Sequence, residues 1–400
     1  MRRRRAVLGG WAVAVLVAAG CAGGHGEHRE HGEHDASPTG APTGASTSPV
    51  VPSGRLPGTA SPSVPAPVPH PVPVSTAAIG SPASVPFRLP GPTRAAGPRA
   101  AAAPSPPVPA GPVTDPLTGG AVSTNPVVAV KIDNTFFQVP QFGVADADMV
   151  FVEQVEGGLT RLMAVFHTVL PAEVGPVRSV RSTDAELLPA FGRPALVFAG
   201  GADGPMSDLG RTSIVDTSAR DDAYFRSDAA WGTYNLHADL QRIARLPGLG
   251  AARSIGTVFD DRDPRLAAGR PVHELGVTME AGRTDFVYQA QRWTRTRQGS
   301  PVTDWSGALQ APDNVLVLHV TDEPDGTVDT LGAPSFLSHT VGSGAATLYR
   351  NGRALDGRWA RPAAGASFRL VADVDGQPLR FKPGRTWIVL APQSARVDES

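Results

Sequence analysis

The chain has very little cysteine, since Cys21 is the only one among its 400 residues. A single thiol cannot form an intramolecular disulfide, and a cysteine-rich zinc site cannot be built from it. The chain also lacks an excess of either charge, because 36 Lys and Arg stand against 37 Asp and Glu. This balance gives no support for nucleic acid or for an acidic membrane surface as a partner.

Familiar catalytic motifs are missing as well. The sequence contains no H-E-x-x-H, no G-x-S-x-G, no phosphate-binding P-loop and no dinucleotide fingerprint after an expected strand. A cysteine nucleophile is excluded if Cys21 has the role argued next. An enzyme built from this chain would have to work with carboxylates and arginines, and we expect neither a cofactor nor a metal site.

Residues 1–20 have the composition of an export signal. Arg2 to Arg5 form a positive region, and the apolar run from Ala6 to Ala19 is too short for a comfortable transmembrane helix. Small residues precede Cys21, as in a bacterial lipobox, although Ala18 stands where leucine is usual. The alternative is a plain secretory signal with a chance cysteine. We favour lipidation of Cys21, which predicts a protein lipid-anchored on the extracytoplasmic face of the cell membrane.

Residues 21–112 are predicted to be a disordered linker. From Ala36 to Pro112 the chain consists largely of Pro, Ala, Ser, Thr, Gly and Val without apolar periodicity, so it cannot bury enough surface to become ordered. The first part carries a histidine at every third position. Such a tract can bind Zn, Cu or Ni, but its glycines leave no rigid frame to select a metal, so we favour a solvated spacer. These histidines are His25, His28, His31 and His34.

The rest of the chain is long enough for two domains, and the predicted fold class is α+β. Residues 113–255 predict a mixed α/β domain with strands at 127–132 and 195–199. A helix from Leu236, capped by Asn235, is also predicted there. Residues 272–396 predict a mostly β domain, because apolar or alternating runs of strand length recur there and Asn-Gly and Asp-Gly turns separate some of them.

A β-hairpin is the clearest local feature of the first domain. Two runs rich in β-branched and aromatic residues flank Glu156-Gly157-Gly158. With a three-residue loop, Gly158 takes a left-handed conformation and Glu153 faces Arg161. With a two-residue loop the register slips by one residue, and Arg161 then faces Gln154. Both registers bring an acid and an arginine together, and in the first they lie among apolar side chains as a buried ion pair.

Further polar residues follow the strands of this domain. Arg178, Ser179 and Arg181 precede an expected capping box at 183–186, whose helix should end near Pro189. Arginines before a helix N-terminus form a reasonable anion site, although Asp184 would partly neutralise it.

Asp133 and Asn134 end the strand at 127–132. They are equally consistent with ligand contact and with a simple turn, since such side chains bond their own backbone.

The order of these motifs resembles the YerB-like lipoprotein family, a domain of unknown function with N- and C-terminal parts. The resemblance covers roughly residues 115–392 and rests on V-A-V-K-I-D-N, E-G-G-L-T-R, G-P-V-R-S-V-R and V-F-A-G-G. It implies a two-part extracytoplasmic lipoprotein without an established activity or cofactor. The family's Pro-His-Asn triplet is here Thr233-Tyr234-Asn235, so a role resting on that histidine is not carried over. Asn235 is retained as a candidate ligand-binding residue.

Two functions from different classes are consistent with these residues. The first is a non-catalytic envelope module that binds an anionic cell-wall component or an envelope protein in a groove lined by Arg161, Arg178 and Arg181. The second is a hydrolase or lyase acting on an envelope polymer, with Glu153 and Glu156 as acid and base. Catalysis of the glycosidase type needs two carboxylates about 5–10 Å apart in an open cleft, which a structure can test.

Overall fold

The computed structural model describes residues 113–135, 140–230, 232–328 and 332–400. The predicted signal segment and linker, with Cys21 and the four regularly spaced histidines, lie outside these residues. Within them, no helix has the length and apolar character needed to cross a membrane.

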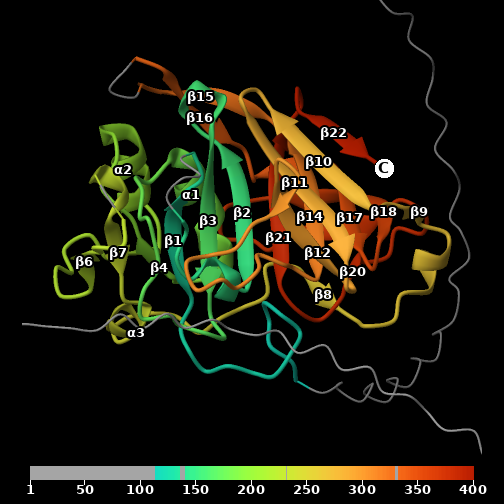
Figure 1. The fold of residues 1–400 in the computed structure, drawn as a ribbon, viewed down its shortest axis with the longest axis horizontal. Helices are drawn as coiled ribbons and strands as arrows, with labels where there is room; N and C mark the ends of the chain where they lie inside the picture. Colours follow the sequence, from blue (N-terminus) through green and yellow to red (C-terminus); the bar gives the residue numbers. More distant parts are fainter. Residues whose placement is uncertain (1–112, 136–139, 231, 329–331) are drawn as a thin grey trace, which may run out of the picture. The chain divides into compact units, whose positions relative to one another are not determined.

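A mixed sheet of eleven strands runs through the described part of the chain (Figure 1). Its order is β19-β18-β17-β14-β21-β2-β3-β1-β4-β5, and β9 pairs with β18 beside this path. The strands are β1 (Val128–Asp133), β2 (Met149–Gln154), β3 (Thr160–Phe166), β4 (Ala195–Val197), β5 (Val215–Asp216), β9 (Arg270–Pro271), β14 (Asn314–Val320), β17 (Gly342–Arg350), β18 (Arg353–Arg361), β19 (Arg369–Ala372) and β21 (Thr386–Pro392).

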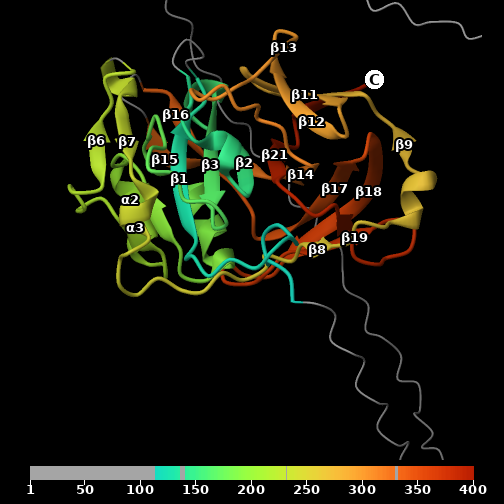
Figure 2. The same ribbon diagram turned by 60° about the horizontal axis from the view of Figure 1, so that its bottom comes forward.

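A second sheet, of order β13-β12-β11-β10-β22, covers one face of the large sheet (Figure 2). Phe286 of this sheet meets Trp387 of β21 edge to face, with the ring centroids 5.7 Å apart. Both belong to one buried cluster with the side chains of β1 and β2 that point to this side. The strands are β10 (Glu274–Met279), β11 (Gly282–Gln289), β12 (Arg292–Arg297), β13 (Ser300–Pro301) and β22 (Arg396–Glu399).

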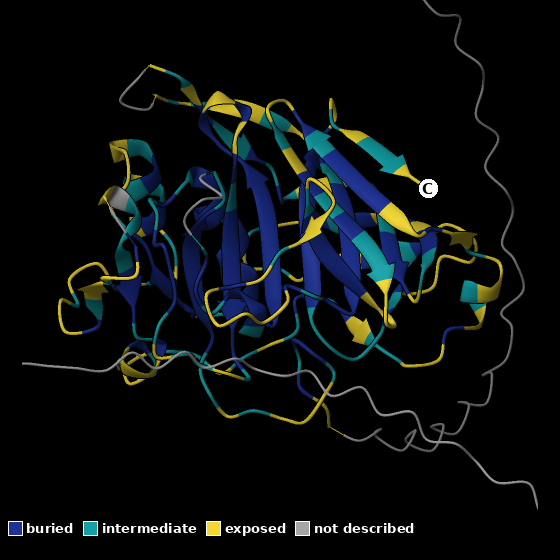
Figure 3. Cartoon of the chain, in the orientation of Figure 1, coloured by how far each residue is buried: buried dark blue, intermediate teal, exposed yellow. Residues whose placement is uncertain are grey.

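The opposite face of the large sheet is packed by short helices, and Leu187, Leu188 and Phe191 contribute to its core. Because successive side chains of a strand point to opposite faces, Val128 and Val130 lie in one core and Ala129 in the other. Burial on both sides explains the nearly continuous apolar runs of the central strands (Figure 3). Leu240 and Ile243 of α3 and Val144 of η1 lie instead in the core on the side of the second sheet. The helices of the described residues are α1 (Ser182–Leu187), α2 (Asp203–Gly210), α3 (Leu240–Ile243), η1 (Val144–Asp146), η2 (Glu156–Gly158), η3 (Leu188–Phe191), η4 (Gly232–Tyr234) and η5 (Pro264–Ala267).

Six further strands are described, and two of them form an arm that follows β14. The strands are β6 (Tyr224–Arg226), β7 (Leu236–Ala238), β8 (Val258–Phe259), β15 (Asp322–Val328), β16 (Pro334–Ser338) and β20 (Arg380–Phe381). The arm is the pair β15 and β16. The described part of the chain is thus mostly β with few, short helices.

The three-residue register of the hairpin is confirmed. Glu153 pairs with Arg161 across β2 and β3, and Val155 N–H donates to the Leu159 carbonyl at 2.8 Å. Gly158 has a φ of 69°, the left-handed conformation that the loop requires.

The predicted helix from Leu236 with Asn235 as its cap is wrong. Residues 236–238 form β7, which pairs with β6, and the helix begins only at Leu240. Asp239 caps it, since its carboxylate accepts from Gln241 N at 2.9 Å. The apolar residues from Leu236 onward have the spacing of a helix. Ala238 pairs with Val174, however, and this pairing keeps the first part of the segment in a strand.

The capping box predicted at 183–186 lies two residues earlier, with Arg181 at the N-cap and Asp184 as the acid. α1 begins at Ser182, and Asp184 accepts from Arg181 N at 2.7 Å. Glu186 is used elsewhere, since it accepts from Val341 N at 2.7 Å. The α-helix ends at Leu187, close to the predicted stop near Pro189.

Candidate functional site

The candidate residues lie at one edge of the large sheet. β1 and β2 are both antiparallel to β3, and β4 is parallel to β1. The carboxyl ends of β1, β2 and β4 therefore lie at the same edge of the sheet. The segment before α1 crosses this edge, because Asp133 N donates to the Pro176 carbonyl at 3.0 Å and Val180 N to the Gly200 carbonyl at 2.9 Å. The carboxyl ends of strands are the common place for ligands in sheets with parallel strands.

Lys131 is the buried centre of the charges at this edge. Its amino group contacts Glu153, and its Nζ lies 2.9 Å from Asp184 Oδ1. All three side chains are fully buried. The buried ion pair expected between Glu153 and Arg161 is therefore wrong, although the register that suggested it is right. Sequence reasoning missed Lys131, whose signal was a lone cation in an otherwise apolar strand.

Asp133 is shared by two arginines. Its Oδ1 lies 3.5 Å from Arg161 NH1 and 3.4 Å from Arg178 Nε. The same carboxylate accepts from the Thr135 hydroxyl at 2.8 Å, so it also forms the turn that the sequence allowed. Burial lowers the pKa of Arg161, and Asp133 opposes this only in part. Arg178 also packs over the Tyr234 ring, with its guanidinium 4.2 Å from the ring centroid.

Asn134 connects this edge to the second sheet. Its Oδ1 accepts from Arg295 NH2 at 2.5 Å and from Arg297 NH2 at 3.5 Å. Arg295 is buried and also donates to Gln310 at 2.7 Å. Burial, and to a smaller extent the charge of the neighbouring Arg297, lowers the pKa of Arg295 to about 9. Neither Arg295 nor Arg297 of β12 was singled out from sequence, because their contacts come from strands distant in the chain.

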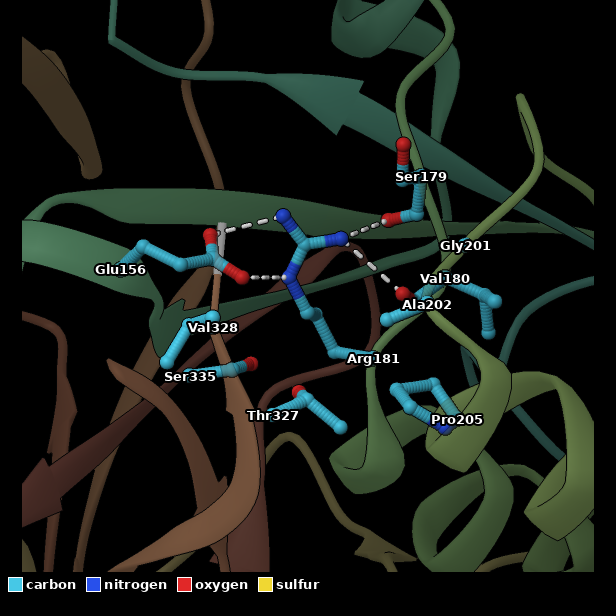
Figure 4. Close-up of a pocket in the computed structure, with 10 residues that line it drawn as sticks. All are labelled: Glu156, Ser179, Val180, Arg181, Gly201, Ala202, Pro205, Thr327, Val328 and Ser335. Carbon is cyan, nitrogen blue, oxygen red and sulfur yellow. Dashed lines mark hydrogen bonds and ion pairs between the residues drawn. The ribbon is translucent and has the colours of Figure 1, made fainter. Parts of the chain in front are cut away.

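Arg181 forms a tight ion pair with Glu156 at the wall of a cavity of about 390 Å³ (Figure 4). Arg181 Nε lies 2.6 Å from Glu156 Oε1, and NH2 donates to Oε2 at 2.7 Å. NH1 donates to the carbonyls of Ser179 and Val180 at 3.1 and 2.9 Å. Burial would raise the pKa of Glu156, but the hydrogen bond and charge of Arg181 outweigh it and hold this pKa low.

The remaining cavity wall comes from three segments. Ser179 lines it, while its hydroxyl donates to the Ala199 carbonyl at 3.0 Å. Pro205 of α2 and Val328 of the β15–β16 arm lie on other sides (Figure 4).

Glu153 and Glu156, the two carboxylates considered for catalysis, differ in whether a substrate could reach them. Glu153 is fully buried against Lys131, so a substrate cannot reach it in this conformation. Glu156 lines the cavity but is held by Arg181. In the described residues, no group of three or more His, Cys, Asp or Glu could hold a metal ion.

Asn235 bonds an arginine of β6, while its neighbours Tyr234 and Leu236 contact the segment of Arg178. Its side chain accepts from Arg226 NH1 at 2.8 Å.

Residues 115–251 match the model described as the N-terminal domain of a protein of unknown function (DUF3048), and residues 275–388 match its C-terminal domain. The chain belongs to this YerB-like family. It is 26% identical over 293 residues to a Bacillus subtilis (strain 168) protein named "Putative lipoprotein YerB", covering 70% of this chain and 86% of that protein. The crystal structure of YerB from Bacillus subtilis has a similar fold, with a TM-score of 0.57 and 22% identity, over 72% of this chain and 99% of that one.

Both DUF3048 parts contribute to the same sheet and to the same edge. β2 of the N-terminal match pairs in parallel with β21, which begins in the C-terminal match. Asn134 and Arg297 bring the two parts together at the site. The motifs that carry the family resemblance also build it, because E-G-G-L-T-R supplies Glu156 and Arg161 and G-P-V-R-S-V-R supplies Arg178 and Arg181.

Proposed function

We propose that the protein is a non-catalytic, extracytoplasmic lipoprotein that binds an anionic component of the cell envelope at the carboxyl edge of its large sheet. The observation that carries this proposal is the sharing of Asp133 by Arg161 and Arg178. Asn134 and Ser179 are the neutral polar groups at the same edge.

Arg161 and Arg178 differ from Arg181 in the distance between the guanidinium and its carboxylate partner. Charge-assisted N–H···O bonds are usually about 2.7–2.9 Å long, which is the range of the Arg181–Glu156 pair. Arg161 and Arg178 lie farther from their shared carboxylate, at 3.5 and 3.4 Å from Asp133 Oδ1. Both arginine side chains are less than a fifth exposed, and an anion that completes the arrangement would offset their desolvation.

Catalysis by two carboxylates is the less supported alternative. Of the two, Glu153 lies out of reach in the core and Glu156 is already neutralised by Arg181. We therefore assign Glu153 and Glu156 to structure and Arg181 to the wall of the cavity. Turnover of cell-wall polymer that is lost in Glu156→Gln would favour a hydrolase or lyase instead.

Binding should depend on the two arginines that share Asp133. Arg161→Met and Arg178→Met should each weaken binding of purified cell-wall fragments about tenfold or more, because each removes one ligand-facing positive charge. Affinity for the unmodified protein should also fall with added salt. Calorimetric titration measures both effects, with Arg211→Met as control, since Arg211 is exposed and pairs with Asp208 on α2. Unchanged affinity for cell-wall fragments in both Arg161→Met and Arg178→Met would contradict the proposed binding site.

Membrane attachment is proposed to occur through Cys21. The lipoprotein name of the relative and the export-type segment before Cys21 support this assignment. Cys21→Ser should move the mature protein from the membrane fraction to the medium, or leave it unprocessed, as immunoblots of cell fractions would show. Soluble behaviour of the unmodified protein would contradict the anchor but not the binding site.

A further inference from the structure

We propose that the side chains of Lys131 and Asp184 become joined by an isopeptide bond, and that Glu153 carries the protons of this self-reaction. The buried ion-paired cluster described above is the starting state of the reaction. The inference is independent of the proposed binding function, because it concerns buried residues and requires no ligand.

The three side chains approach one another from separate elements of the fold. Lys131 lies in β1, Glu153 in β2 and Asp184 in α1. Lys131 Nζ lies 2.9 Å from Asp184 Oδ1 and also contacts Glu153, and none of the three side chains is exposed. Groups that a fold holds roughly 3–3.5 Å apart react far faster than the same groups free in solution. An amine, a carboxyl group to attack and a second carboxyl group to move protons are therefore held in contact.

Lysine is rare in this chain, which makes its use at this position informative. Lys131 and Lys382 are the two lysines of the sequence, and arginine supplies the other basic side chains. Burial alone does not explain the choice, because Arg295 and Arg361 are buried as well. Arginine holds its proton and is no nucleophile at neutral pH, whereas a buried ammonium can become a neutral amine. Burial lowers the pKa of Lys131 to about 8, and Asp184 opposes this shift only in part.

The two carboxyl groups have different surroundings that suit different roles. Among the described residues, no hydrogen-bond donor other than the Lys131 amino group reaches either oxygen of Glu153. A buried carboxylate without further donors is costly, so it accepts a proton readily. Asp184 Oδ2, by contrast, accepts from Arg181 N at 2.7 Å. This N–H polarises the carboxyl group and stabilises the negative charge that develops on Oδ2 when the amine attacks.

The reaction is a condensation that needs no other reagent. Glu153 takes a proton from the Lys131 ammonium, and the amine attacks Cγ of Asp184, so that a C–N bond forms. Glu153 passes this proton and then the second amine proton to Oδ1, and the Cγ–Oδ1 bond breaks. Oδ1 leaves as water, and both protons of this water come from the ammonium. The amide keeps one N–H and has Oδ2 as its carbonyl oxygen, and Glu153 returns to its starting state.

The bond cross-links two residues that lie 53 positions apart in the chain. It fastens the start of α1 to β1, and so holds the segment that carries Arg178 and Arg181 across the edge of the sheet. A cross-link between distant positions stabilises a fold chiefly by restricting the unfolded chain. A chain with a single cysteine cannot form such a link as an intramolecular disulfide.

Mass spectrometry of the denatured full chain tests the bond directly, because an amide survives unfolding and an ion pair does not. With Cys21→Ser to prevent lipidation, we expect an intact mass lower by one water than the sequence requires. Trypsin should fail to cleave after Lys131, and the peptide with this residue should stay joined to the peptide that begins at Ser182. A full mass, with separate peptides cut after Lys131, would overturn the inference.

Lys382 is the matched control within the same protein. Its Nζ lies 3.1 Å from Asp313 Oδ1, but its side chain is a fifth exposed. We expect no bond there, so Lys382→Met should leave the loss of water and the joined peptides unchanged. A cross-link of Lys382 to Asp313 to the same extent would indicate dehydration during handling and would also overturn the inference.

Glu153→Gln tests the proton carrier separately from the bond. Glutamine keeps the size of the side chain but does not take up the proton. In protein isolated at successive times after synthesis, the bond should form at least tenfold more slowly, with an unchanged far-ultraviolet circular dichroism spectrum. Bond formation at the rate of the unmodified chain would overturn the role of Glu153. If the Glu153→Gln protein does not fold, the mass of the unmodified chain still decides whether the bond exists.

Discussion

Lys131→Met is expected to destabilise the protein by about 3–5 kcal/mol, because it leaves two buried carboxylates without their cation. Glu153 and Asp184 both contact the Lys131 amino group, and none of the three side chains is exposed. Asp184 also holds the start of α1 through Arg181 N, so the loss should extend to the segment that positions Arg178. Urea unfolding followed by circular dichroism measures the effect.

A double variant and a second lysine provide the controls for this prediction. Adding Glu153→Leu to Lys131→Met removes one of the two unpaired charges and should restore part of the lost stability. Lys382→Met should cost less than Lys131→Met, since Lys382 is a fifth exposed and its partner Asp313 keeps Arg292 at 3.5 Å and the Arg385 N–H at 3.1 Å. A Lys131→Met protein as stable as the Lys382→Met protein would mean that the buried cluster is not ionised as described.

Arg181→Met should be the second most damaging change at the site, at about 2 kcal/mol. It removes both bonds to Glu156 and the two bonds to backbone carbonyls, and it leaves Glu156 charged and largely buried. Arg178→Met should cost roughly 1 kcal/mol or less, because Asp133 keeps Arg161 as a partner. Thermal and urea unfolding of the two variants side by side test this contrast.

Glu156→Gln in the Arg181→Met background is the matched control, because it removes the unpaired charge. It should recover part of the stability that Arg181→Met loses. If Arg178→Met unfolds as readily as Arg181→Met, then Arg178 is also a structural arginine and the proposed anion site loses one of its members.

Local sequence patterns determined much of the fold. The apolar runs of β1 and β2, the hairpin loop at 156–158 and the turn at Asn351-Gly352 each depend on neighbouring residues. Their strands were predicted correctly for that reason. The helix predicted from Leu236 failed because Ala238 pairs with Val174, a residue far away in the sequence. The spacing of apolar residues within a short segment cannot reveal a strand partner that is distant in the sequence.

The composition of the site was visible in the sequence, but its pairing was not. The sequence by itself placed Glu153 and Arg161 on adjacent strands of the hairpin, with two registers open, and the structure selected one of them and placed β1 beside β3. Only the tertiary structure decided that Glu153 pairs with Lys131, that Arg161 and Arg178 share Asp133, and that β12 supplies Arg297. Ion pairs act over a few ångströms between side chains that chain folding brings together, so strand order and sheet packing select the partners.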